Sequence, residues 1–85
     1  MQYRIELAAN RRGARVDLPG RSLELAARRA GSAAWDVSVT DAAGGPPGTV
    51  TVSAPTAVDA VWRVARAAVQ AFAELAGDRL PEPSP

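Results

Sequence analysis

The chain has 85 residues, with ten Arg, nine acidic residues and no Lys, Cys or His, and its net charge is +1. This length fits one domain, and the composition excludes stabilisation by disulfides or by Cys and His zinc sites. It also excludes an imidazole base, a thiolate nucleophile and lysine Schiff-base chemistry. We therefore expect a single non-catalytic domain with no metal and no cofactor.

Charge is distributed unevenly along the chain. Residues 1–31 hold seven Arg and three acids, a balance of +4, whereas residues 32–85 hold three Arg and six acids, a balance of −3. Such asymmetry can steer an anionic partner to one end of the molecule, or bring two copies together head to tail. The exclusive use of Arg is also what GC-rich codon usage produces, so it is not by itself a sign of function.

Nothing in the sequence resembles a targeting or membrane segment. Met1 leads into alternating polar and apolar residues rather than a basic and then apolar signal. The most apolar stretch is interrupted by Arg63, Arg66 and Gln70, so no run approaches the roughly 18 to 20 residues that span a bilayer. We expect a cytoplasmic protein without a membrane span.

The first two elements are predicted to be strands. Apolar and polar side chains alternate over residues 2–8 and again over residues 14–18, as they do in strands with one buried face. Residues 10–13 between them favour a turn, so the two strands are expected to form a hairpin that ends at Pro19 and Gly20.

A short helix is expected next. Ser22 is a suitable N-cap, Gly31 is a suitable C-terminal stop, and Arg28 with Arg29 would complement the negative end of the helix dipole. The apolar residues of this segment recur at helical spacing, at Leu23, Ala26, Ala27 and Ala30.

Two further strands and a long helix complete the pattern. Alternation predicts strands over residues 35–40 and 49–54, joined by a loop without catalytic side chains. Thr56 and Asp59 have the spacing of a capping box, and apolar residues then keep a helical period for about five turns up to Gly77. This final helix is the strongest local signal in the chain.

These elements predict an α+β fold, a two-layer sandwich in ββαββα order. Its four-stranded, mainly antiparallel sheet would carry both helices on one face, because that arrangement buries every apolar stripe. We expect one domain over residues 1–78 and a Pro-rich, disordered tail over residues 79–85.

The final helix suggests a role in association. Its polar stripe is narrow, so the helix could bury one side on its own sheet and another on a partner. We therefore expect a non-catalytic interaction or assembly module that binds itself or a larger protein through this helix or a sheet edge. Trp62 and Trp35 each fit a core position as well as an interface. The candidate interface residues are Trp62, Val64, Ala67 and Ala71.

An alternative function is that of a small nucleic-acid-binding regulator, because arginine side chains suit phosphates. Carboxylates and hydroxyls on the same sheet face would repel phosphate or pair with the arginines, and stacking aromatics are missing there. We favour association for this reason. The arginines of the alternative are Arg4, Arg11, Arg12, Arg15 and Arg21.

Overall fold

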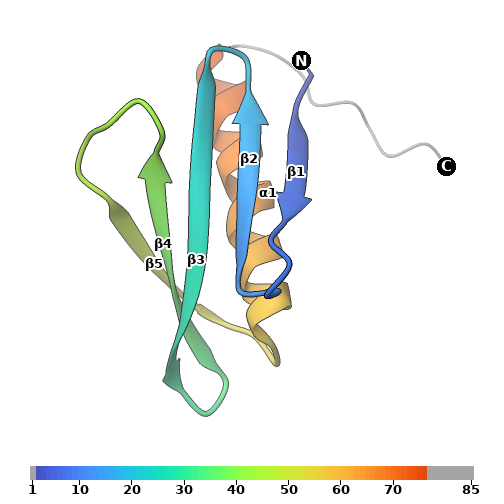
Figure 1. Ribbon diagram of the computed structural model, residues 1–85, viewed down its shortest axis with the longest axis vertical. Coiled ribbons are helices and arrows are strands. Elements are labelled where there is room, and N and C mark those ends of the chain that lie inside the picture. The colour runs from blue at the N-terminus through green and yellow to red at the C-terminus, as the bar shows by residue number, and fades with distance from the viewer. Residues whose placement is uncertain (1, 77–85) are drawn as a thin grey trace, which may run out of the picture.

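The computed structural model describes residues 2–76. Its elements are β1 (Arg4–Leu7), β2 (Gly13–Leu18), β3 (Arg21–Gly31), β4 (Ala34–Asp41), β5 (Gly48–Ser53) and α1 (Ala57–Ala76). The strands form one antiparallel sheet in the order β1-β2-β3-β4-β5, and α1 packs against one face of it (Figure 1). The protein is thus a small α+β domain, but the predicted ββαββα order with four strands and two helices is wrong.

The error lies in the segment predicted as the first helix, which is the strand β3. Every second side chain of β3, at Leu23, Leu25 and Ala27, points toward α1. Leu25 is one of the core residues, but it was not among the apolar positions of the predicted helix. β3 pairs with β2 on one side and β4 on the other, so its backbone groups are satisfied within the sheet. Helix propensity of Ala is a weak preference that such two-sided pairing overrides.

The connections explain why these strands stay adjacent. Pro19 and Gly20 form the turn between β2 and β3, where Gly20 adopts the positive φ of 74° that a side chain would disfavour. A two-residue turn at Ser32 and Ala33 joins β3 to β4, next to a register shift between Arg29 and Gly31. The four strands predicted from alternation are all present, with ends that differ by at most two residues.

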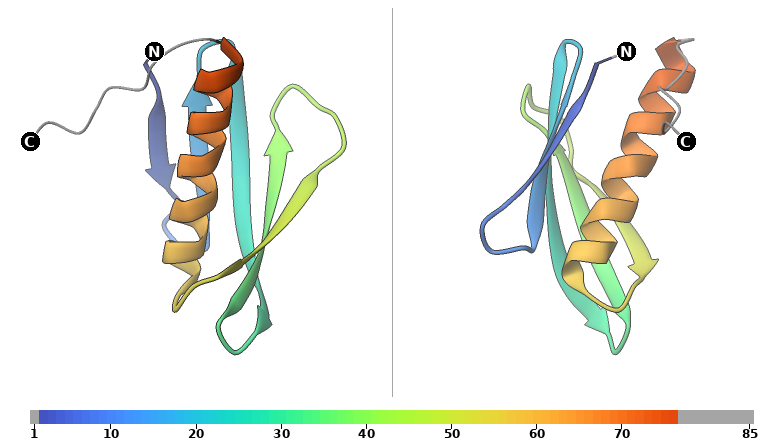
Figure 2. Two further views of the ribbon diagram at one scale, coloured as in Figure 1. Left: turned by 180° about the vertical axis from the view of Figure 1, so that it is seen from behind. Right: turned by 90° about the vertical axis from the view of Figure 1, so that its right-hand side faces the viewer.

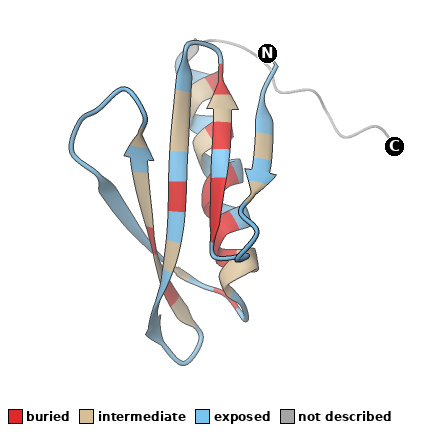
Figure 3. Cartoon of the chain, in the orientation of Figure 1, coloured by how far each residue is buried: buried red, intermediate tan, exposed pale blue. Residues whose placement is uncertain are grey.

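The core lies between α1 and the sheet, as the two layers in Figure 2 show. Val16 of β2, Val37 of β4 and Val61 of α1 are its largest fully buried side chains. Buried positions concentrate on the middle strands and α1 (Figure 3). Because α1 contacts β2, β3 and β4 more extensively than β5, the sheet is covered at its centre and less so at that edge.

The start of α1 matches the predicted cap. The hydroxyl oxygen of Thr56 accepts a hydrogen bond from the backbone N–H of Asp59 at 3.2 Å, and the N–H of Ala60 donates to the Thr56 carbonyl at 3.1 Å. Gly77, the predicted stop, and the predicted tail over residues 79–85 lie outside the described residues. Within residues 2–76, no helix is long and apolar enough to cross a membrane.

Candidate interaction site at the edge of the sheet

β5 is an edge strand whose composition favours pairing. It reads Gly-Thr-Val-Thr-Val-Ser, with no charged side chain, and it is exposed along nearly its whole length (Figure 3). No other strand within residues 2–76 covers the side of β5 that faces away from β4, which we call its outer edge. Edge strands are usually protected by charges, prolines or bulges, and an uncharged β-branched edge is a template for another strand. Pro47 and Pro55 flank β5 and limit the length that can pair.

The register shows which backbone groups point to the outer edge. The N–H of Ala54 donates to the carbonyl of Ala33 at 2.9 Å, which makes these two residues a hydrogen-bonded pair. Such pairs alternate along an antiparallel ladder, so Val50 and Val52 bond to β4. The backbone groups of the intervening residues therefore point outward, and these residues are Thr49, Thr51 and Ser53.

One end of the outer edge is already occupied. Arg63 of α1 donates from Nη1 to the carbonyl oxygen of Ser53 at 2.9 Å. Pro47, just before the strand, has no N–H to offer. The outer edge thus presents both the N–H and the C=O of Thr49 and Thr51 to an incoming strand.

An apolar side chain lies beside these groups. Val50 is opposite Val37 in the register, so it points to the same face as α1. Val37 is 0% exposed, whereas Val50 is 44% exposed because α1 does not reach this part of the sheet. The end of the β4-β5 hairpin projects away from α1 in Figure 1. A strand added to β5 would bury Val50.

The opposite edge, β1, is short and charged. It has four residues, and Arg4 and Glu6 form an ion pair at 3.4 Å on the open face, the face of the sheet away from α1. On the neighbouring strand, Arg15 pairs with Asp17 at 3.0 Å. The hydroxyl of Ser22 also donates to Asp17, and this bond, followed by the hydrogen bond from Arg15, lowers the pKa of the Asp17 carboxyl.

The arginines of the alternative function are mostly paired. Arg4 and Arg15 have the partners just described, and Arg21 pairs with Asp41 at 3.0 Å. Each of these carboxylates would repel phosphate at that position. Pairing of carboxylates with arginines was one of the two outcomes expected from the sequence, and these three arginines show it.

Arg11 and Arg12 are placed differently, and they are joined by an arginine that the sequence analysis missed. Both lie at the exposed β1-β2 turn, where Arg11 has a φ of 59°. Arg29 of β3 lies with its guanidinium 5.0 Å from the ring centre of Trp35. All three arginines line a hollow of about 310 Å³ beside the start of α1. Among residues 2–76, none of the three has an acidic group within ion-pairing distance.

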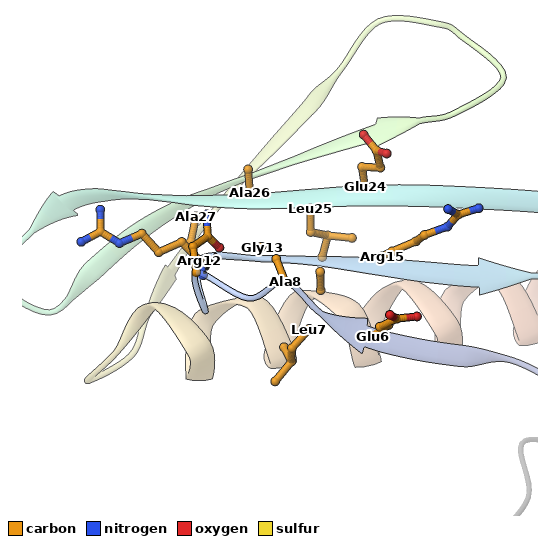
Figure 4. A pocket seen from close by; sticks show the side chains of 12 residues that line it. Glu6, Leu7, Ala8, Arg12, Gly13, Arg15, Glu24, Leu25, Ala26 and Ala27 are labelled. Atoms are coloured by element: carbon orange, nitrogen blue, oxygen red, sulfur yellow. Dashed lines mark hydrogen bonds between the residues drawn. The ribbon is translucent and has the colours of Figure 1, made fainter.

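A larger and shallow hollow, of about 580 Å³, lies on the open face over β1, β2 and β3 (Figure 4). Its floor is made of small residues such as Ala8, Gly13 and Ala26, and its rim carries both acidic and basic side chains. Gly13 is needed there because a Cβ at this position would lie 2.8 Å from the carbonyl oxygen of Leu25. The hollow thus results from close strand packing, and its mixed charges select no particular ligand.

The candidate interface residues of α1 do not form one surface. Val64 is 6% exposed and packs in the core, whereas Trp62, Ala67 and Ala71 are exposed. At about 100° per residue, Trp62 is roughly 140° and 180° around the helix axis from Ala67 and Ala71. Trp35, by contrast, is a core residue whose indole donates to the Ala54 carbonyl at 3.1 Å.

Comparisons of the chain with protein-family models, curated proteins and solved structures find no match. Among the described residues, no group of three His, Cys, Asp or Glu side chains is placed to hold a metal ion. The function is therefore inferred from the geometry of this chain alone.

Proposed function

We propose that this domain is a non-catalytic interaction or assembly module that associates by accepting a further strand at the outer edge of β5. The observation that supports it is an exposed, uncharged edge strand with outward backbone groups on Thr49 and Thr51 and the exposed Val50 between them. Backbone hydrogen bonds would supply affinity, and the side chains on either face would set the register.

The edge is better suited to this role than the helix. A partner docking on α1 would find Trp62 on one flank and the small side chains of Ala67 and Ala71 on the other, with Val64 already packed inward. A partner at β5 would satisfy polar backbone groups and cover Val50 in a single contact. Of the two docking surfaces expected from the sequence, the final helix and a sheet edge, we therefore favour the sheet edge.

A lysine on β5 tests the proposal. Thr51→Lys places a charge on the edge strand, where lysine opposes strand addition, while the exposed side chain leaves the core intact. We expect light scattering at micromolar concentration to show an assembly for the wild type, and an association at least about tenfold weaker for the variant.

The matched control is Thr40→Lys, which adds the same charge to the same face on the inner strand β4. This control should associate like the wild type. A wild type that remains monomeric and binds no added β-strand peptide of the Gly48–Ser53 sequence would contradict the proposal. Equal weakening by both lysines would do so as well.

A second candidate is binding of nucleic acid at the hollow lined by Arg11, Arg12 and Arg29. Its support is the convergence of three arginines from two segments beside the start of α1. We expect affinity for a nucleic acid to fall steeply with salt, and Arg11→Ala combined with Arg12→Ala and Arg29→Ala to flatten that dependence. Binding that ignores both salt and these substitutions would rule this candidate out.

A further inference from the structure

The outer edge of β5 is self-complementary. Two antiparallel copies of one strand related by a twofold axis must place one residue opposite its own copy, and that residue defines the register. Hydrogen bonds across the new pair require residues whose backbone groups point outward. On β5 these are Thr49 and Thr51, since the Ser53 carbonyl is already bonded to Arg63.

A register centred on Val50 uses both of these residues. Thr49 of each copy then lies opposite Thr51 of the other, and each of the two pairs exchanges two backbone hydrogen bonds. Ser53 lies opposite Pro47 of the second copy, outside the strand, so Arg63 stays where it is. A register centred on Thr51 would instead bring the incoming strand onto Ser53 and the Arg63 guanidinium.

The side chains fit the same register. Val50 would face Val50 of the second copy in a non-hydrogen-bonded pair, where the two Cα atoms approach to about 4.5 Å and side chains are closest. That contact covers an apolar residue that is 44% exposed in the single chain. On the open face, threonines lie opposite threonines, and no charged side chain of β5 meets a like charge.

From these observations we infer that the strand accepted by β5 is β5 of a second copy of this chain, antiparallel and centred on Val50. This inference rests on the proposed function and names its partner. The result is a closed dimer with one continuous sheet through both copies and both α1 helices on the same side. The β1 strands lie at its two ends, so pairing at β5 does not propagate.

Single cysteines test the register, because the chain has no Cys of its own and each introduced thiol is unique. Disulfides form when Cα atoms lie about 4.4 to 6.8 Å apart, which suits a Val50 pair. Val50→Cys should cross-link to a dimer under mild oxidation at least about tenfold faster than Thr51→Cys alone, because the two copies of residue 51 would be diagonal neighbours about 7 to 8 Å apart. An equal mixture of Thr49→Cys and Thr51→Cys should form a mixed disulfide that neither forms alone.

Three results would overturn the inference. Fastest cross-linking of Thr51→Cys alone would show the other register. A folded Val50→Cys variant that cross-links no faster than a thiol at the exposed Thr40 would show that no second copy lies at β5. If Val50→Cys gives that result while the wild type binds the Gly48–Ser53 peptide and Thr51→Lys does not, the outer edge accepts an added strand without forming this dimer, and the proposed function survives. If the wild type is monomeric and does not bind the peptide, both fail.

Discussion

The two edge strands of the sheet, β1 and β5, differ in how their outward backbone groups are protected from pairing with another strand. On β1 the N–H of Ala8 donates to the carbonyl of Gly13. Hydrogen-bonded pairs alternate along the ladder, so the backbone N–H and C=O groups of Ile5 and Leu7 point away from β2. A second copy that used both of these residues would place Glu6 opposite its own copy. The equivalent residue on β5 is Val50.

The residue that would lie opposite its own copy therefore distinguishes the two edges: Glu6 on β1 would repel its copy, whereas Val50 on β5 would not. Two carboxylates opposite each other are destabilising, whereas two valines in a non-hydrogen-bonded pair are favourable. Length acts in the same direction, because β1 has four residues and β5 has six. If β5 pairs as proposed, the charges of β1 would confine pairing to one side of the sheet, in the way edge strands are commonly protected.

The largest expected effect concerns how β5 is held in the sheet. Trp35 fills the core beneath the end of β5, and its indole donates to the Ala54 carbonyl just after the strand. Trp35→Ala should lower the free energy of unfolding by about 3 to 5 kcal/mol, the usual cost of removing a buried aromatic side chain. Urea denaturation followed by circular dichroism measures this loss.

Ile5→Ala provides the corresponding change at β1. Ile5 is only partly buried and makes no such hydrogen bond, so its loss should be clearly smaller. Equal losses at the two sites would show that the edges are anchored alike, and that only their charge distinguishes them.

The sequence predicted four of the five strands and the last helix but misassigned β3, the segment that determines the sheet order. Over residues 22–31, Ala residues recur at helical spacing while Leu23, Leu25 and Ala27 also alternate, so both periods fit. The choice depends on the neighbours, because β2 and β4 satisfy the backbone of β3 on both sides. Local propensity contains no information about this pairing.

The same error hid part of the candidate site. With a helix at residues 22–31, Arg29 belonged to a helix end, and its position over Trp35 had no signal in the sequence. The uncharged composition of β5 was readable from its six residues, and so was the possibility of docking at a sheet edge. That β5 is an edge strand follows only from the five-stranded order.

A glycine on each side of the sheet gives the next largest contrast. A Cβ at Gly13, at the start of β2 beside β1, would lie 2.8 Å from the Leu25 carbonyl oxygen, so the backbone must shift. Gly13→Ala should cost about 1 to 3 kcal/mol of unfolding free energy, as overpacking does. Thermal unfolding of the purified variant measures this loss.

Gly48, the first residue of β5, is the matched control. A Cβ there meets nothing within 4 Å, so Gly48→Ala should be neutral or should stabilise by about 0.4 to 1 kcal/mol through the unfolded chain. A loss at Gly48 comparable to that at Gly13 would show that β5 is packed as closely as the β1 side, contrary to the comparison.

The smallest expected effect is a pH dependence on the β1 side of the sheet. Asp17 lies opposite Arg4 of β1, and its pKa is lowered from 3.8 by the hydrogen bond from Ser22 and then by that from Arg15. A carboxyl whose folded pKa is lowered contributes stability above its unfolded pKa, and this contribution disappears as the pH falls through the folded value. The stability deficit of Asp17→Asn should therefore be present at neutral pH and shrink below about pH 4.

Ser22→Ala separates the two causes of this shift. Removing the hydroxyl leaves Arg15 as the main partner, so an NMR titration should show the Asp17 pKa rising part of the way toward its ordinary value. An unchanged pKa would assign the shift to the arginine alone. In that case the ion pair with Arg15, rather than the Ser22 hydroxyl, keeps Asp17 ionised beside Arg4. That ion pair then maintains the charged character that distinguishes the β1 side of the sheet from β5.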